Sequence, residues 1–212
     1  MMRLAPEGRT FIVVAWAAVA LLALANAWIP LVLLLPMAIW VVMFFRDPVR
    51  LGPTDPLAIV APADGRIVSI IAIDEPTFLQ GSSTRVAIFM NVFNVHVNRY
   101  PATGRVAFRS YQRGRFVHAA SEKASSDNEQ SNIGVEVSEG RGRVLIRQIA
   151  GLVARRIVTD HNEGREVARG DRLGLIRFGS RVDLFLPPQV SLQAAVGDRT
   201  IAGETIIAMW AP

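Results

Sequence analysis

The 212-residue chain contains no cysteine, only three histidines and only two tyrosines. The absence of cysteine excludes disulfides, zinc–thiolate sites and thiol nucleophiles. Charged residues make up only 19% of the chain, and none occurs between Phe11 and Phe45. Any nucleophilic chemistry must therefore use another side chain, and the uncharged segment needs its own explanation.

The uncharged segment is about 35 residues long, and as one helix it would extend roughly 50 Å, beyond a hydrocarbon core of about 30 Å. Pro30 and Pro36 disfavour a single straight helix, and a turn region begins at Asn26. We expect an α-helical hairpin, with helices near Phe11–Ala27 and Leu31–Phe45. Each helix is short for a complete span, so a spanning hairpin and one lying in a single leaflet both fit.

Arginines flank this segment on both sides, with Arg3 and Arg9 before it and Arg46 and Arg50 after it. Positive charge on both flanks favours a cell-membrane anchor with both ends, and the domain that follows, in the cytoplasm. A cleaved signal peptide is the competing interpretation, because ALANA at 23–27 resembles a cleavage site. The apolar run continues well past that point, which favours a retained anchor.

Beyond Arg50 the sequence has no long 3.6-residue periodicity, but many short alternating or apolar runs that predict strands. These runs lie at 65–74, 84–91, 104–110, 133–139, 143–150, 173–179, 181–187, 190–196 and 204–210. The predicted fold is mainly β, a barrel-like sandwich of short strands preceded by an N-terminal membrane-associated α-helical hairpin. We assign residues 1–46 to the anchor and 47–212 to the β-rich domain.

Some connections between these runs also carry signals. Gly170-Asp171 and Gly197-Asp198 predict hairpin turns. The polar stretch Ser121–Asn132 has no strand character, and it fits either a surface loop or an active-site loop.

The net charge of +5 and the pI near 10.8 predict an anionic partner. Nucleic acid, an anionic bilayer and an acidic small substrate are all compatible with that charge. The basic residues are scattered through strands, tyrosine is scarce, and a membrane segment is attached. These features favour an anionic membrane or lipid and argue against nucleic acid.

Few residues can carry acid–base or nucleophilic chemistry. We expect Asp64 in a turn that opens a strand and His96 in a strand. Gly179-Ser180 interrupts two strand-like runs. Together they supply an acid, an imidazole and a hydroxyl, the groups that activate a serine oxygen. Taken singly, Asp64 also fits an ordinary turn and His96 an ordinary hydrogen-bonded strand residue. His96 and Asn98 fall one ligand short of an H-x-H zinc pair, so we expect no metal site.

Certain sequence segments occur in a characteristic order: PADGRI (62–67), FNVHVNRYP (93–101), NEQ (128–130), GLVARRI (151–157) and IRFGSRVDLFLP (176–187). So arranged, after an apolar anchor, they closely resemble the short, pyruvoyl-dependent form of phosphatidylserine decarboxylase. The resemblance covers nearly all of the chain after Arg46. The segment around Gly179-Ser180 is its most specific part.

The resemblance implies an enzyme that converts phosphatidylserine in an anionic membrane to phosphatidylethanolamine and carbon dioxide. Its cofactor would be a covalent pyruvate (pyruvoyl) group, formed when Ser180 attacks the Gly179 carbonyl and the backbone breaks between them. Chains 1–179 and 180–212 would remain together as a heterodimer. By position, Asp64 matches the family's aspartate for self-processing, and His96 matches a histidine associated with decarboxylation.

The chain also departs from the longer forms of that family. Arg99 stands where they have a second histidine, the proposed base for self-cleavage, and Arg181 stands where they have threonine. Two assignments of the base stay open: His96 serves both steps, or Asp64 acts more directly. Arg99 fits binding of the substrate's phosphate or carboxylate, and equally an exposed strand arginine.

Two other functions are compatible with the residues. One is a non-catalytic, membrane-tethered β-domain that binds an anionic partner, and the other is a related pyruvoyl decarboxylase for a different amino-acid headgroup. Ala154–Arg156 fits either contact with anionic headgroups or a solvated edge strand. We assign structural or loop roles to His118 and His161. Headgroup and acyl-chain preference and oligomeric state have no signature in the sequence.

Overall fold

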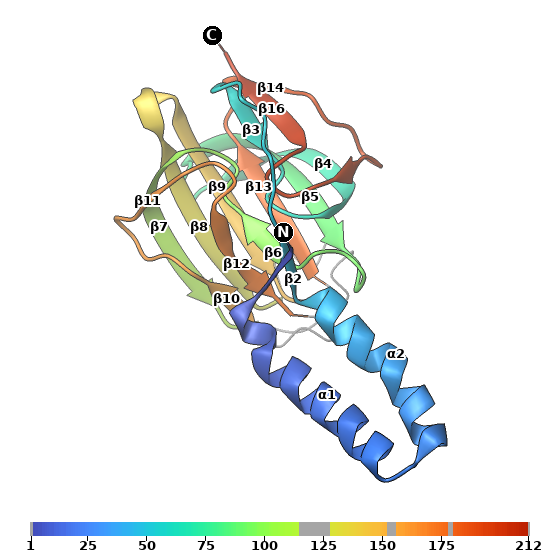
Figure 1. The fold of residues 1–212 in the computed structure, drawn as a ribbon. Coiled ribbons are helices and arrows are strands. Elements are labelled where there is room, and N and C mark those ends of the chain that lie inside the picture. Colours follow the sequence, from blue (N-terminus) through green and yellow to red (C-terminus); the bar gives the residue numbers. More distant parts are fainter. Residues whose placement is uncertain (1, 115–127, 152–155, 178–179, 212) are drawn as a thin grey trace. The chain divides into compact units, whose positions relative to one another are not determined.

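The computed structural model describes residues 2–114, 128–151, 156–177 and 180–211 (Figure 1). The chain divides into two compact units, Met1–Val49 and Arg50–Pro212. The first unit is largely helical, and the second is built from strands. The predicted fold, mainly β with an N-terminal pair of helices, is therefore confirmed.

The N-terminal unit consists of β1 (Met2–Leu4), the 3-10 helix η1 (Pro6–Gly8), α1 (Arg9–Leu24), α2 (Trp28–Phe44) and β2 (Arg46–Pro48). The helix α2 begins earlier than the sequence predicted. Pro30 lies in its first turn, where the missing N–H of proline is not needed. Between the helices, Asn26 adopts a left-handed φ of 55°, which asparagine tolerates better than most residues.

The surface of the helical pair is strongly apolar. No residue of α1 is buried, and the side chains of Leu24, Ile29 and Leu33 are 80%, 79% and 75% exposed. Soluble monomers rarely expose contiguous apolar surface on this scale. The helix Pro6–Leu24 is long and apolar enough to cross a membrane, whereas Trp28–Phe44 is shorter.

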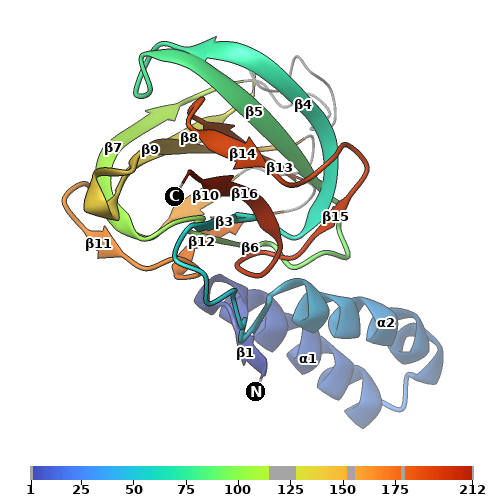
Figure 2. The same cartoon turned by 90° about the horizontal axis from the view of Figure 1, so that it is seen from above.

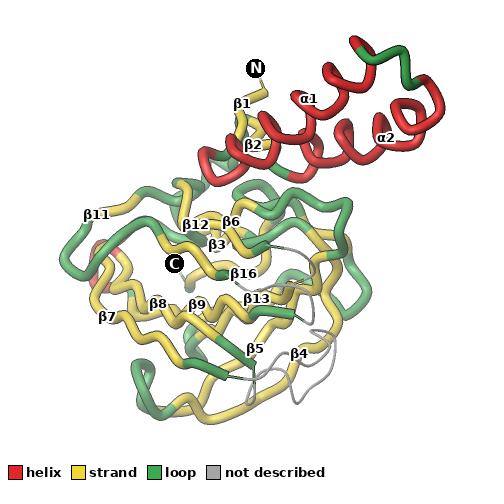
Figure 3. Tube along the Cα trace, turned by 90° about the horizontal axis from the view of Figure 1, so that it is seen from below, coloured by secondary structure: helices red, strands yellow, loops and turns green. Residues whose placement is uncertain are grey.

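The second unit is organised around an eight-stranded antiparallel sheet that curls over the core (Figure 2). In spatial order its strands are β11 (Glu166–Val167), β7 (Gly104–Gln112), β8 (Gln130–Val137), β9 (Gly142–Ile149), β13 (Ser180–Leu186), β5 (Gly81–Met90), β4 (Gly65–Glu75) and β15 (Arg199–Thr200). Two smaller sheets complete the unit: β10 (Ile157–Thr159), β12 (Arg172–Ile176) and β6 (Val97–Arg99), then β14 (Val190–Leu192), β16 (Ile206–Trp210) and β3 (Ala58–Val60). Figure 3 shows the same curl from the opposite side.

The strand β13 lies inside the large sheet and is buried along its whole length. Val182, Leu184 and Leu186 belong to the main core, as the period of two in a strand requires. The opposite face is covered as well, because Phe185 packs in a smaller core cluster with Phe78. Phe78 lies in the connection between β4 and β5. This double coverage leaves β13 no solvent-facing side.

Two local predictions are wrong. Gly170-Asp171 and Gly197-Asp198 do form tight turns, in which each carboxylate accepts a backbone N–H from three residues earlier at 2.8 Å. Among the described strands, however, those that flank each turn belong to different sheets, so neither turn closes a hairpin. The loop expected at Ser121–Asn132 ends earlier, because Gln130 begins β8, and residues 115–127 lie outside the described part.

Candidate active site

Ser180 is the first residue of β13 and is fully buried. Its cross-strand partner is Met90, the last residue of β5. The Ser180 hydroxyl donates a hydrogen bond to Met90 Sδ at 3.4 Å. A thioether is a weak acceptor, so the hydroxyl is positioned without a strong hydrogen bond. Gly179, the other half of the predicted cleavage site, lies outside the described residues.

A series of polar side chains, all buried except the half-buried Thr159, leads away from Met90, and we call it the polar chain. Asn98 Nδ2 donates to Met90 Sδ at 3.6 Å, and Asn98 Oδ1 accepts from Gln148 Nε2 at 2.8 Å. Gln148 Oε1 accepts from Thr159 Oγ1 at 2.9 Å, and Thr159 Oγ1 lies 3.0 Å from Ser131 Oγ. The polar chain therefore links β8, β10, β9, β6 and β5 through side chains.

The hydrogen bonds of the polar chain have one direction. Because Thr159 donates its only hydroxyl proton to Gln148, Ser131 must be the donor in the bond between Ser131 and Thr159. Every donor then points toward Met90 Sδ, where the polar chain meets the Ser180 hydroxyl.

The polar chain was not predicted from the sequence. Asn98 was considered only for a zinc site, which it cannot complete, and Gln148 lies in the apolar run 143–150, to which no polar role was assigned. The available signal was a polar side chain at a core-facing strand position, since Gln148 pairs with Val182 of the main core. A fully buried polar group at such a position needs a partner.

The Asp64 carboxylate is held on both oxygens. Oδ2 lies 2.7 Å from Arg50 Nη2, and Oδ1 accepts the Ala202 N–H at 2.8 Å. At Gly65 a Cβ atom would lie only 2.2 Å from the Phe89 carbonyl oxygen, so no side chain fits there. The Asp-Gly pair thus marks a close approach of β4 to β5 and not a solvent-exposed turn.

His96 is fully buried and directly precedes Val97 of β6. Its Nδ1 lies 3.0 Å from the Asn94 carbonyl oxygen. Because a carbonyl only accepts, Nδ1 must carry the proton, and the neutral ring then has its lone pair on Nε2. This is the tautomer of a general base that acts through Nε2.

The two arginines that depart from the family pattern have different surroundings. Arg99, the last residue of β6, is partly buried, and its Nη1 donates to the Gly170 carbonyl oxygen at 2.9 Å. Arg181 is fully buried, with Nε 2.5 Å from Asp183 Oδ1. Successive side chains of a strand point to opposite faces, so Arg181 lies on the other face of β13 from Ser180.

Backbone pairing brings the candidate residues to one end of the β unit. Met90 of β5 pairs with Ser180 on one side, and the strand that Asp64 precedes pairs with β5 on the other. The Ser180 hydroxyl itself bonds to Met90 Sδ, and not to His96 or Asp64.

Backbone hydrogen bonds also join the segment that leads to Asp64 with the segment that follows His96. The Arg99 N–H donates to the Pro62 carbonyl oxygen at 2.9 Å, and the Val60 N–H donates to the Pro101 carbonyl oxygen at 2.9 Å. The two segments are therefore antiparallel. The bonded residues Pro62 and Arg99 lie two residues from Asp64 and three residues from His96, and residues 62–64 form a bend that leads into β4.

The remaining candidates are not part of this arrangement. His161 Nδ1 lies 3.3 Å from the Tyr100 hydroxyl, and burial raises the pKa of Tyr100 to about 12, so this pair fits the structural role expected for His161. His118, Ala154 and Arg155 lie outside the described residues, and Arg156 is exposed. Within the described ranges, no cluster of three or more histidine, aspartate and glutamate side chains could hold a metal ion.

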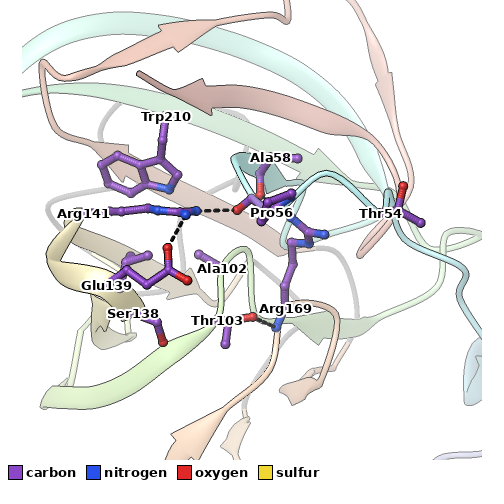
Figure 4. Close-up of a pocket in the computed structure, with 11 residues that line it drawn as sticks. Thr54, Pro56, Ala58, Ala102, Thr103, Ser138, Glu139, Arg141, Arg169 and Trp210 are labelled. Atoms are coloured by element: carbon purple, nitrogen blue, oxygen red, sulfur yellow. Dashed lines mark hydrogen bonds and ion pairs between the residues drawn. The ribbon is translucent and has the colours of Figure 1, made fainter. Parts of the chain in front are cut away.

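A pocket of about 280 Å³ lies at the other end of the strands, near Val137 and Trp210 (Figure 4). Its arginines bind the backbone of the 53–58 segment. Arg141 donates to the Pro56 carbonyl oxygen at 2.8 Å, and Arg169 donates to the Ala58 carbonyl oxygen at 2.8 Å. These contacts support the fold, and none of the predicted site residues lines the pocket.

Comparison with known proteins gives a consistent result. The chain matches the family model described as phosphatidylserine decarboxylase over residues 37–208. It is 42% identical to a phosphatidylserine decarboxylase proenzyme of Geotalea uraniireducens over 204 residues, which cover 96% of this chain and 95% of the relative. It is 44% identical to the proenzyme of that name from Nitratidesulfovibrio vulgaris over 208 residues, covering 98% and 94% of the two chains. With the one from Xanthobacter autotrophicus the identity is 49% over 174 residues, covering 81% and 74%.

The polar chain predicts a specific cost for Gln148→Leu. The substitution removes the partner of Asn98 Oδ1 inside the core, so we expect the free energy of unfolding to fall by about 1–3 kcal/mol. Urea unfolding of the detergent-solubilised chain measures it. Gln193→Leu, at an exposed position, is the matched control and should change stability little. Equal effects of the two substitutions would contradict the role of the polar chain.

Proposed function

Because the chain belongs to the phosphatidylserine decarboxylase family, we propose that it converts phosphatidylserine to phosphatidylethanolamine and carbon dioxide with a pyruvoyl group made from Ser180. One observation carries the proposal: Ser180 begins the buried strand β13, and within the described part of the chain its hydroxyl bonds to a thioether, Met90 Sδ. A hydroxyl on so weak an acceptor can turn toward a neighbouring carbonyl at little cost. The name proenzyme, given to the relatives, agrees with a chain that is cut to become active.

The surroundings of Ser180 fit a cofactor precursor. The segment that would become the small chain, 180–212, contains β13, β14, β15 and β16. Of these strands, β13 pairs with β5 and β9, β15 pairs with β4, and β16 pairs with β3, all of the segment 1–179. A break before Ser180 would therefore leave two chains joined by backbone hydrogen bonds and a shared core, as the proposed heterodimer requires.

Self-cleavage would begin when the Ser180 oxygen attacks the Gly179 carbonyl carbon and the amide becomes an ester. Elimination of that ester would release the Gly179 carboxylate, and hydrolysis of the resulting dehydroalanine, with loss of ammonia, would leave the pyruvoyl group. Glycine at the attacked position has no side chain to obstruct the approach. The step needs a base to take the hydroxyl proton.

We assign the base to His96. Its bond to the Asn94 carbonyl requires the proton on Nδ1, so in the neutral ring Nε2 is the nitrogen that can accept a proton. The Asp64 carboxylate is instead engaged by Arg50 and the Ala202 N–H. Asp64 is then a positioning residue, which holds the segment that leads into β4 against its neighbours.

In the decarboxylation itself, a pyruvoyl group supplies a ketone that can take up the electrons of the broken carbon–carbon bond. His96 would return a proton to the substrate carbon after carbon dioxide leaves. The Arg99 guanidinium is suited to bind the substrate's phosphate or carboxylate. In the pre-cleavage geometry it is held by the Gly170 carbonyl, close to the segment that contains Asp64.

The N-terminal hairpin, residues 1–46 in our assignment, would anchor this catalytic domain in the cell membrane, where the substrate resides. Within the hairpin unit β1 and β2 pair antiparallel, with Arg3 opposite Asp47. In a membrane this pairing would keep both ends of the hairpin on one side, and their arginines favour the cytoplasmic side. Anchoring raises the effective concentration of substrate at the site.

The first prediction of this proposed function concerns cleavage. Mass spectrometry of the purified protein should find chains 1–179 and 180–212, the latter with a pyruvoyl mass at its N-terminus. Ser180→Ala should remain a single 212-residue chain and release no carbon dioxide from phosphatidylserine. Ser191→Ala, an exposed serine in the same segment, should be cleaved normally. An uncut wild-type chain that releases carbon dioxide would disprove the pyruvoyl mechanism.

The second prediction concerns the base. Loss of a general base costs roughly 10²–10⁴-fold in rate, so His96→Ala should slow self-cleavage by that factor in a pulse-chase experiment. Asp64→Asn should have a smaller effect, because it keeps the acceptor for the Ala202 N–H. His161→Ala is the control for loss of an imidazole elsewhere. If Asp64→Asn is the slower variant, the base is assigned wrongly.

The third prediction concerns orientation, and the cysteine-free chain makes it direct. A single cysteine at the exposed Ser82 should react with a membrane-impermeant maleimide only after spheroplasts are permeabilised. Labelling of intact spheroplasts at that position would place the domain on the outer side. A cysteine at Asn26, between the helices, then separates a spanning hairpin, which is labelled from outside, from one in the inner leaflet, which is not.

A further inference from the structure

Two exposed arginines lie opposite each other at the edge of the large sheet. Arg199 of β15 is the direct cross-strand partner of Arg66 on β4. Among the described residues neither arginine forms an ion pair. Arg66 Nε donates a hydrogen bond to the Gly197 carbonyl oxygen at 2.9 Å. Like charges directly opposite on antiparallel strands are destabilising. A bound anion would remove that repulsion.

The arginine pair lines a pocket of about 420 Å³ together with Phe89, Asn91 and Phe93. Phe89 and Asn91 are the chain neighbours of Met90, which pairs with Ser180. The pocket therefore lies beside the end of β5 that borders the candidate active site. No residue to which we assign a catalytic role lines it.

The turn after β5, residues 91–94, presents apolar side chains to solvent. The Asn91 N–H donates to Asn94 Oδ1 at 2.9 Å, and the Phe93 N–H donates to Asn91 Oδ1 at 2.9 Å. These bonds fix the turn, yet Val92 is 37% exposed and Phe93 is 72% exposed. An apolar tip beside fixed cations matches the chemistry of a bilayer surface, where phosphates lie above acyl chains.

We propose that turn 91–94 and the pair Arg66–Arg199 form a docking surface for an anionic lipid bilayer, in addition to the N-terminal hairpin. The guanidinium groups would bind lipid phosphates, and Val92 and Phe93 would enter the interface. A free phosphate would use only the arginines, and a nucleic acid gains no stacking surface from Val92. Docking here would turn the end of β5 beside Ser180 toward the lipid headgroups.

A fluorescent label on the turn tests this docking. Val92→Cys gives the full-length chain a single thiol, which can carry a polarity-sensitive fluorophore. In vesicles of phosphatidylcholine with phosphatidylglycerol, which is not the proposed substrate, the emission should shift to the blue relative to phosphatidylcholine alone, and salt should reverse the shift. The same fluorophore at Ser82, at the other end of β5, should not respond.

Arginine variants decide whether the pair is responsible. Each of Arg66→Gln and Arg199→Gln should lower the ratio of docked to undocked label roughly fivefold. The matched control replaces the exposed Arg105 and Arg143 with glutamine, which removes the same charge elsewhere on the β-rich unit. It should leave the blue shift of the label unchanged. An unchanged shift in the Arg66/Arg199 double variant, or an equal loss in the control, would overturn the proposal.

This inference extends the proposed function without depending on it, because the fluorescence needs no turnover. The intact mass of each labelled protein reports self-cleavage separately. An uncleaved chain that still shows the arginine-dependent shift would count against the pyruvoyl mechanism alone. A cleaved chain without the shift would count against the docking surface alone.

Discussion

The backbone hydrogen bonds that join β13 to β5 on one side and to β9 on the other are the constraint on which the rest of this structure depends. They set Ser180 opposite Met90 and place Val182 and Leu184 in the core. A strand with two neighbours and both faces covered cannot shift by one residue without turning its whole core-facing set the wrong way. A new chain end created at Ser180 would therefore keep the position that the uncut strand already has.

Rigid placement and weak hydrogen bonding coexist at Ser180. Its backbone is held by the sheet, while its hydroxyl rests on Met90 Sδ, an acceptor that also receives a bond from Asn98. The polar chain beyond Asn98 satisfies groups that would otherwise be costly in so apolar an interior. Through the bond from Asn98 Nδ2 to Met90 Sδ, the polar chain also fixes the Met90 side chain. The surroundings thus hold the serine oxygen in place without a strong hydrogen bond, which the proposed self-cleavage would require.

Two features of the chain suit a membrane, and they differ in physical character. The helical pair α1 and α2 is apolar on nearly all sides and carries no charge between Phe11 and Phe45, so its partition depends on the hydrophobic effect. The proposed docking surface combines the charges of Arg66 and Arg199 with the apolar side chain of Phe93. Its strength would depend on salt and on anionic lipid, as that of the helical pair would not. For an enzyme whose substrate is itself an anionic lipid, the second feature would also select the substrate-rich surface.

Local pattern alone determined much of this protein: alternation predicted the β-rich unit, and the uncharged run with its prolines predicted the pair of helices. The ordered motifs were enough to name Ser180, His96 and Asp64 as candidates. Short strands such as β6, with three residues, carry too little pattern for their bounds to be predicted, and His96, which was expected in a strand, directly precedes β6. The polar chain, the tautomer of His96 and the ion pair of Asp64 with Arg50 were decided only by the tertiary structure. The polar chain joins strands that are distant along the chain, the ion pair joins residues 14 positions apart, and the tautomer follows from the bond that the folded backbone gives His96 Nδ1. A sequence pattern records only the preferences of neighbouring residues and not these side-chain geometries.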